Sequence, residues 1–503
     1  MSRKGEIRAQ VAVVGGGPVG LLVAADLGAR AVDTVVIERA AAVSEQPKAN
    51  TLHARAVQCL ARRGHLPAGS APYVGGASPF HFGGLPGLVI TAPEGEPEPI
   101  LKCSQADLER LFEERARRAG VRILREHQVT GIVQEPDGVR ITAEGPGGTV
   151  TCVTGYAVGA DGARSTVREQ SGIESETYPA TVAAMAATVT LPDPAALAPG
   201  WHRTPRGWIV AKPDTGGRTH VRTANFLRVH ADRHSPLGLE ELRREASWIA
   251  GREIAMDAPR WLSRFSDFTR LARNFRAGRV FLAGDAAHMH FPIGGQGLSA
   301  GVLDALDLSW KLALAVHGTA SAGLLDTYDL ERRPAARRIV ENTRAQLALM
   351  REGTEADALR AVFAEILAAD PTGGCLGGMI SAQDTVLPEP TGWSAPDAGR
   401  FLHNVALTTA TVKTDVIGLL AEGKPLLLLF GEKGSRYRDA AREWEGTLRV
   451  VHAMPTPDVP HEALLVRPDG YIAWAPGRDG LAVALSAYLA RGVRVRHPRR
   501  SGV

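Results

Sequence analysis

The stretch VAVVGGGPVGLLVAADLGARAVDTVVIER, Val11 to Arg39, decides the fold. Val11–Val14 is an apolar, β-branched run that predicts a buried strand, and Leu21–Arg30 predicts a helix after it. Between them, Gly15–Gly20 is too rich in glycine to continue either element and predicts a tight turn. Thr34–Glu38 predicts a second strand, so the whole stretch is a β-α-β unit.

The glycines of this turn have the spacing of a dinucleotide-binding loop. Gly15, Gly17 and Gly20 form G-x-G-x-x-G, which lets backbone N–H groups approach a pyrophosphate at the helix N-terminus. Glu38 ends the second strand about 20 residues on, where a carboxylate can accept hydrogen bonds from ribose hydroxyls. An ordinary glycine turn is the alternative. The predicted adenine-dinucleotide site comprises Gly15, Gly17, Pro18, Gly20, Glu38 and Arg39.

The bulk composition is that of a globular protein with more than one core. A chain of 503 residues predicts two or three domains, and 44% hydrophobic with 22% charged residues excludes a disordered chain. The net charge of +4 is too small to indicate nucleic acid as a partner. Val11–Ala29 is nearly uncharged, but its Gly-Gly-Gly-Pro centre would interrupt a spanning helix. We therefore expect neither a membrane span nor a signal peptide.

The cysteines indicate neither a zinc site nor a disulfide framework. Cys59, Cys103, Cys152 and Cys375 lie far apart in the chain and form no CxxC pair and no Cys/His cluster. This usage fits a reducing cytoplasm, which is the expected location of the protein.

The rest of the chain alternates between helical and strand-rich segments. Ser104–Ala119 predicts an amphipathic helix with Ser104 as its N-cap. A Gly- and Pro-rich stretch, Pro371–Pro396, predicts a linker before a separate small α/β unit. The other expected elements are a helix over Asn50–Arg63, short strands over Val121–Asp161, a strand-rich region over 176–265 with a helix near Leu239–Ala250, helices over Leu298–Val316 and Asp326–Met350, and a hairpin over Ala463–Ala475.

Two further motifs resemble a known family. YAVGADGARSTVRE, Tyr156–Glu169, resembles the DG motif of class A flavoprotein monooxygenases, and RVFLAGDAAHMHFPIGGQG, Arg279–Gly297, resembles their GD motif. LLVRPDGYIAWA, Leu464–Ala475, is similar to the closing hairpin of members with a thioredoxin-like third domain. HFGGL, His81–Leu85, and PRWLSRF, Pro259–Phe265, resemble the branch of aromatic-polyketide hydroxylases and rifampicin monooxygenase. Further resemblance lies in PKANTLHAR, SQADLER and DTYDLERRP.

The resemblance implies an α/β fold with three domains. A Rossmann-like FAD-binding domain of the PHBH-type fold would comprise residues 1–175 and 266–385, with 73–103 contributing to the middle domain. A strand-rich substrate domain would span 176–265, and a thioredoxin-like domain would span 386–503. Since the third domain lacks CxxC, a structural or assembly role is expected for it.

The resemblance also implies which residues hold non-covalent FAD. Asp285 would hold the ribityl chain, although a carboxylate here could also be an N-cap or turn acid. Lys48 stands where the family usually has an arginine near the phosphates, and Arg55 falls at a second basic position; the alternative for each is a solvated basic residue. The remaining implied contacts are Gln105 and Asp161 outside the loop, Gly284 in the turn, and Pro292, Gly295, Gln296, Gly297 and Leu298 along the flavin ring.

The chain departs from the family near the flavin. Ser299 replaces a common asparagine and Gln58 replaces a common glutamate, so we expect altered flavin geometry or redox poise with FAD still bound. No catalytic side chain is nominated; the flavin-proximal residues are Pro292, Gly295 and Ser299. His288 and His290 stand two apart and are followed by glycines rather than acids, so no metal site is expected. We expect His288 to be structural and His290 to lie near the flavin or substrate entrance.

The function implied by the resemblance is oxygenation. NADPH would reduce FAD, O₂ would form the C4a-hydroperoxyflavin, and one oxygen would pass to an aromatic polyketide of antibiotic biosynthesis. Oxygen insertion beside a ketone of the Baeyer–Villiger type and rifampicin-like naphthohydroquinone oxygenation are alternatives. A flavin oxidase, reductase or halogenase, or a non-catalytic flavin-binding protein, is less favoured. A monomer or homodimer without nucleic-acid or membrane partners is expected. The candidate substrate contacts are His81, Trp208, Arg222 and Phe226.

Overall fold

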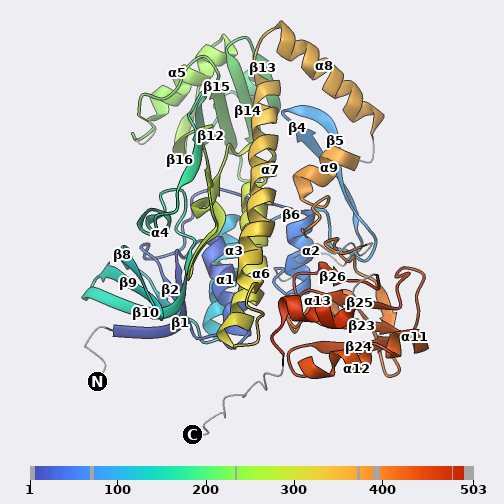
Figure 1. Ribbon diagram of the computed structural model, residues 1–503. Helices are drawn as coiled ribbons and strands as arrows, with labels where there is room; N and C mark the ends of the chain where they lie inside the picture. The colour runs from blue at the N-terminus through green and yellow to red at the C-terminus, as the bar shows by residue number, and fades with distance from the viewer. Residues whose placement is uncertain are drawn as a thin grey trace.

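A central, mostly parallel sheet carries the N-terminal part of the chain (Figure 1). The computed structural model describes residues 6–67, 73–232, 235–370, 374–388, 397–477 and 480–491. Strand β1 (Glu6–Val14) lies at the middle of the order β18-β19-β10-β1-β2-β7 and pairs in parallel with β2 (Thr34–Ile37) and β10 (Gly148–Gly159). The other strands of this sheet are β7 (Arg122–Leu124), β8 (Gln128–Glu135), β9 (Gly138–Gly145), β18 (Arg276–Ala277) and β19 (Val280–Leu282).

Three helices pack around this sheet and place the glycine turn. Helix α1 (Pro18–Ala29) follows the turn directly and packs against α3 (Gln105–Arg118) and α6 (Gly297–Val316). In α3 the hydroxyl of Ser104 accepts the N–H of Asp107 at 3.1 Å. The predicted β-α-β unit and the predicted N-cap are both confirmed.

The predicted helix over Asn50–Arg63 begins later than expected. Thr51–His53 forms a short strand, β3, that pairs with β6 (Ile100–Lys102), and helix α2 runs over Ala54–Arg62. The N–H of His53 donates to the hydroxyl of Ser299 at 3.0 Å, which holds this backbone extended. A partner 246 residues away therefore overrides the local helical pattern.

The middle of the chain forms an antiparallel sheet of five strands in the order β13-β14-β15-β12-β16. One face packs on helix α5 (Leu239–Ala250) through an apolar cluster, and the other face contributes Trp208 and Ala224 to a cluster with Phe291 and Ile293, the two neighbours of Pro292. The strands are β12 (Ala183–Thr190), β13 (Gly200–Thr204), β14 (Gly207–Pro213), β15 (Thr219–Asn225) and β16 (Asp257–Ser266), with a short 3₁₀ turn over Pro194–Leu197.

The segment 73–103 stands beside this sheet without joining it. Its strands β4 (Gly76–Phe82) and β5 (Leu85–Ala92) form a separate hairpin that packs on α8 (Thr354–Ala369) and α9 (Gly374–Ser381). Helix α9 lies inside the predicted linker, of which 371–373 and 389–396 fall outside the described residues. The proposed domain boundaries thus remain predictions.

A long helix runs from the first sheet toward the middle sheet. Helix α7 (Thr327–Met350) rises beside α6 toward the middle sheet (Figure 1). A small three-stranded sheet, β11-β17-β20, takes one strand from before the middle sheet in sequence and two from after it. Its strands are β11 (Ser175–Tyr178), β17 (Thr269–Ala272) and β20 (His288–Met289); helix α4 covers Thr166–Gln170, and 3₁₀ turns cover Gly284–Ala286, Ile293–Gly295 and Leu324–Asp326.

The C-terminal unit has its own sheet, in the order β24-β23-β25-β26, with β23 parallel to β24 and antiparallel to β25. This arrangement is consistent with the predicted thioredoxin-like domain. One of its clusters includes Trp310 of α6, so the unit packs directly on the first domain. The elements are β21 (Ala406–Thr408), β22 (Lys413–Asp415), α10 (Val416–Leu420), β23 (Leu426–Phe430), α11 (Gly431–Ser435), α12 (Arg438–Ala441), a 3₁₀ turn at Arg442–Trp444, β24 (Arg449–Ala453), β25 (Ala463–Val466), β26 (Ile472–Trp474) and α13 (Leu481–Tyr488).

Candidate functional site

Two glycines of the first turn are required by sterics. Gly15 has φ +110°, and a Cβ there would lie 2.3 Å from the carbonyl oxygen of Ala160. A Cβ on Gly20 would lie 2.0 Å from the carbonyl oxygen of Gly15. The chain can therefore turn from β1 into α1 only with glycine at both positions.

Gly17 is different, because its Cβ direction is open. No atom lies within 4 Å of a Cβ built there. Gly17 is the N-cap of α1, with extended backbone and no side chain capping the helix, and Pro18 takes the first helical position. The carboxylate of Glu38 accepts the N–H groups of Gly16 and Ala40 beside this turn. An uncapped helix N-terminus with open space in front of it is a cradle for a pyrophosphate.

A buried carboxylate accepts hydrogen bonds from a second turn, Gly284–Ala286, and from its neighbours. Asp304 of α6 accepts the N–H of Gly284 at 3.0 Å and Nε2 of His288 at 2.7 Å. Nε of Arg332 donates to its other oxygen at 2.9 Å. Although burial acts in the opposite direction, His288 and Arg332 lower the pKa of Asp304 to about 2. His288 therefore supports the turn, as predicted.

Asp285 projects from this turn toward open space. It is solvent-accessible and makes no hydrogen bond or ion pair with another described residue, yet surrounding protein raises the pKa of its carboxyl above the usual range. A carboxylate that solvent can reach but that has many protein atoms around it is available to bind a ligand. His288 and Lys48 act on it electrostatically in the opposite sense.

The loop from Pro292 to Gly297 leads into α6. Gly294 and Gly295 have φ of +74° and +63°, conformations that an L side chain rarely adopts. Gln296 is the N-cap of α6 and makes no side-chain cap, so the first N–H groups of α6, including those of Gly297 and Leu298, have no helical acceptors. Oε1 of Gln296 is buried without a hydrogen-bond partner. An orphaned polar atom beside an uncapped helix fits the polar edge of a flavin ring.

Ser299 fastens this loop to the neighbouring strand. Its hydroxyl accepts the N–H of His53, and Nε2 of His53 bonds the carbonyl oxygen of Gly294 at 2.8 Å. Burial lowers the pKa of His53 to about 4, so the ring is neutral, and its Nδ1 has no partner among the described residues. His53 was missed from the sequence; only its position before the basic helix could have indicated it.

The other predicted cofactor residues differ in exposure and in their partners. Arg39 and Lys48 are exposed, and Lys48 acts electrostatically on both Asp285 and Glu109. Nε2 of Gln105 donates to Glu109 at 2.8 Å. Asp161 accepts the hydroxyl of Ser165 and the N–H of Val167 at 3.1 Å, so its carboxylate serves the start of α4.

Arg55 faces the C-terminal unit. Its guanidinium lies 3.6 Å from the ring centre of Phe401 and donates to Oε1 of Gln58 at 2.8 Å and to the carbonyl oxygen of Gln383. The side chain is fully buried, and Nε of Arg55 and Nε2 of Gln58 lack partners. Its contact with FAD therefore stays a prediction, and its described contacts are structural.

The face of the middle sheet opposite α5 is cationic and aromatic. Arg222 of β15 stands opposite Val210 and Ala186 and is accessible, and it makes no ion pair or hydrogen bond with the described residues. His81 packs between Phe80 and Trp201, with ring centres 4.7 Å from each.

The other two predicted substrate contacts, Trp208 and Phe226, belong to or border one apolar cluster. Trp208 is only 3% exposed and its Nε1 donates to the carbonyl oxygen of Met350 at 2.7 Å. It lies on this face inside the buried cluster that includes Phe291 and Ile293, so its contact with substrate stays a prediction. Phe226 is half-buried beside the same apolar cluster.

Two further observations concern the chain as described. No cluster of three or more His, Cys, Asp or Glu residues suited to a metal ion occurs in the described ranges. Among the same residues, no helix combines the length and apolar character needed to cross a membrane.

Comparisons with known proteins agree with this site. Residues 8–343 match the family described as FAD binding domain, and residues 395–492 match the family described as aromatic-ring hydroxylase, C-terminal. The chain is 36% identical to the 12-dehydrotetracycline 5-monooxygenase/anhydrotetracycline 6-monooxygenase of Streptomyces rimosus subsp. rimosus, over 96% of this chain and 99% of that one. It is 33% identical to the rifampicin monooxygenase of Rhodococcus hoagii, over 97% and 99%.

A different activity also occurs among the relatives. The dialkyldecalin synthase of Streptomyces rugosporus is 35% identical, over 95% of this chain and 98% of that one. Among solved structures, BexE, studied for oxidation during BE-7585A biosynthesis, superposes with a TM-score of 0.88 at 35% identity, covering 97% of this chain and all of that one. The matched families span the flavin cradle and the C-terminal unit together, and the chain belongs to the family of FAD-dependent aromatic-ring monooxygenases.

Proposed function

We propose that the protein hydroxylates an acidic aromatic polyketide. The observation that carries this proposal is the position of the cationic, aromatic face of the middle sheet, which shares an apolar cluster with the segment before the flavin loop. In the overall reaction NADPH, a proton, O₂ and the substrate give NADP⁺, water and the hydroxylated product. FAD supplies the redox chemistry that activates O₂.

The chain's own residues bind and orient the cofactor in this proposal. Gly15, Gly17, Pro18 and Gly20 shape the pyrophosphate cradle, and Glu38 is placed for ribose hydroxyls. Asp285 takes the ribityl hydroxyls, because its carboxylate is accessible and otherwise unengaged.

The loop Pro292–Gly297 lies against the flavin ring in this proposal. The N–H groups at the start of α6 then face the ring edge that becomes negative on reduction, and a helix N-terminus favours such charge by about 0.3–1 kcal/mol. Ser299 and His53 hold the loop in place rather than transferring protons, since the ring of His53 is neutral and enclosed.

Arg222 is the proposed substrate anchor. His81 of β4 and Lys102 of β6 lie within electrostatic reach of one another and Arg222 acts on His81, so three basic side chains gather here from three strands. Surrounding protein lowers the pKa of His81 to about 4, which leaves Arg222 and Lys102 as the cations. Nζ of Lys102 donates to Thr51 at 2.8 Å, whereas Arg222 is uncommitted. A guanidinium of this kind suits an acidic phenol or enol of a polyketide.

The test is a turnover assay with the FAD-loaded protein. Anhydrotetracycline and hydroxylated anthraquinones are offered with NADPH in air, and NADPH consumption and product mass are followed. The proposal predicts substrate-stimulated NADPH consumption and gain of one oxygen atom. If every substrate leaves NADPH consumption at its basal rate and emerges with unchanged mass, the proposal is wrong.

The relative that is a dialkyldecalin synthase supports a second candidate, cyclisation without net oxidation. The departure at Ser299 supports considering this candidate, because its hydroxyl holds His53 and through it the loop at Gly294. A cyclase would convert a polyene substrate to an isomer of equal mass without NADPH. Product mass and NADPH dependence therefore separate the two candidates. We also propose a cytoplasmic location, in keeping with the free cysteines of the described chain.

A further inference from the structure

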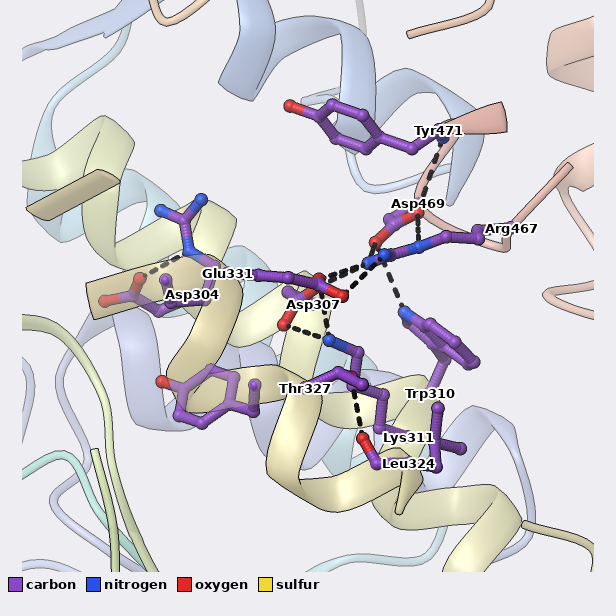
Figure 2. A network of polar contacts seen from close by, with 12 residues as sticks. Asp304, Asp307, Trp310, Lys311, Leu324, Thr327, Glu331, Arg467, Asp469 and Tyr471 are labelled. Carbon is purple, nitrogen blue, oxygen red and sulfur yellow. Dashed lines mark hydrogen bonds and ion pairs between the residues drawn. The ribbon is translucent and has the colours of Figure 1, made fainter. Parts of the chain in front are cut away.

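A buried ionic cluster joins the C-terminal unit to helices α6 and α7 of the flavin-binding domain. Arg467, in the turn between β25 and β26, donates to Asp307 of α6 at 2.6 Å and to Glu331 of α7 at 2.8 and 2.9 Å. It also donates to Asp469 of its own turn at 2.6 and 3.1 Å. Figure 2 shows this guanidinium extending from the C-terminal strand to the carboxylates of the two helices.

The same carboxylates hold a second cation. Nζ of Lys311 donates to Asp307 and to Glu331, each at 2.8 Å, and Nε1 of Trp310 donates to Asp469 at 3.3 Å (Figure 2). All five charged side chains are at most 6% exposed: Asp307, Lys311, Glu331, Arg467 and Asp469. Because buried charges tolerate no unpaired partner, the geometry of this cluster is tightly constrained.

The cluster contains more carboxylates than cations. Three carboxylates face two cations, Lys311 and Arg467. Burial, together with Glu331 and Asp469, raises the pKa of Asp307 well above the usual range. Although burial acts against it, Arg467 and Lys311 lower the pKa of Glu331. Arg467, which bonds carboxylates of both units, is the cation that joins the C-terminal unit to α6 and α7.

Helix α6 connects this cluster to the flavin cradle. Asp304, which holds the Gly284 turn, precedes Asp307 by three residues on the same helix. One turn earlier, a Cβ on Gly301 would lie 2.5 Å from Val19 of α1 and 3.5 Å from Gly284. Helix α6 thus touches both cofactor-binding turns without room for independent movement.

We propose that Arg467 is a positioning residue for FAD: by docking the C-terminal unit on α6, it sets the position of this helix and of the loops that hold the flavin. The unit then acts on the cofactor without touching it. This role does not depend on which substrate is oxidised, so it stands or falls separately from the proposed hydroxylation.

The test compares the FAD-loaded wild type with two variants. Arg467→Lys keeps the charge but cannot span three carboxylates. Arg467→Met combined with Glu331→Gln removes one charge of each sign and so keeps the net charge of the cluster. Arg442→Lys, an exposed arginine of the same unit, is the matched control.

Both cluster variants should bind FAD more weakly, by about 5- to 150-fold, the usual range of coupling between distant sites. The flavin midpoint potential should fall and the visible flavin spectrum should change, because a loosened α6 stabilises the reduced, negative flavin less. The control should match the wild type. Unchanged FAD affinity, spectrum and potential in both cluster variants would overturn the proposal, as would failure of both variants to fold, since a positioning role requires a folded cradle that has shifted.

Coupling is reciprocal, which allows a test without mutation. Adding FAD to wild-type apoprotein should slow amide hydrogen exchange in the turn from Arg467 to Tyr471. This turn contacts α6 at Asp307, away from the N-terminus of α6 that faces the cofactor site. Exchange rates that are the same in both forms would contradict the proposal. This measurement needs neither NADPH nor substrate, so its result is independent of catalysis.

Discussion

Replacing Asp304 by asparagine should test how the second cofactor turn is held. The carboxylate accepts hydrogen bonds from Gly284, His288 and Arg332, and is fully buried. An asparagine side chain has one carbonyl oxygen and carries no charge, so it cannot serve all three donors. Arg332, which is 4% exposed, would keep its charge without a carboxylate.

The expected loss of stability follows from these contacts. Breaking a buried ion pair by removing one partner costs about 3–5 kcal/mol, so the free energy of unfolding near pH 7 should fall by about 3 kcal/mol. The pKa of Asp304 sets how the free energy of unfolding depends on pH. A folded-state pKa of about 2 against the usual 3.8 corresponds to about 2 kcal/mol. Because the pKa is lowered by folding, this stabilisation is present above about pH 4 and is lost as the pH falls toward 2.

The assay is denaturant unfolding of the FAD-loaded protein, followed by tryptophan fluorescence and by release of flavin, from neutral to acidic pH. Asp326→Asn, which breaks an exposed pair with Arg276, is the control and should cost less than about 1 kcal/mol. If Asp304→Asn leaves stability within about 0.5 kcal/mol of the wild type and the acid sensitivity unchanged, the carboxylate does not hold the turn.

Four further variants test the glycine turn and the proposed ligand contacts. Gly17→Ala should leave apoprotein stability within about 0.5 kcal/mol but weaken FAD binding more than about tenfold. Gly20→Ala should instead destabilise the fold, because its Cβ meets the carbonyl of Gly15. FAD titration and thermal unfolding distinguish the two variants. Asp285→Ala should raise the FAD dissociation constant about tenfold with little change in melting temperature, and equal affinity would exclude a role in binding. Arg222→Met should raise KM about 10- to 100-fold with a smaller effect on kcat, and an unchanged KM would remove it as the substrate anchor.

The first turn was predictable because its signal is local. Glycine spacing, a β-branched strand and an acid on the next strand lie within Val11–Glu38, and the structure reproduces each of them. The cap at Ser104 was predictable for the same reason.

The supports of the site were not predictable, because they join distant parts of the chain. His53 meets Ser299 across 246 residues, and Arg467 meets Asp307 across 160. Short-range patterns carry no information about such pairs. Trp208 shows the same limit: nothing local indicates that its indole N–H bonds the carbonyl oxygen of Met350.

The central claim is that the chain transfers one atom of O₂ to an aromatic substrate. It is tested most directly by incubating the FAD-loaded protein with NADPH, an acidic aromatic polyketide such as anhydrotetracycline, and ¹⁸O₂, followed by mass spectrometry of the product. A monooxygenase gives a product that carries one ¹⁸O atom and is formed only with NADPH. A product of unchanged mass, or one that takes its new oxygen from water, would contradict this claim.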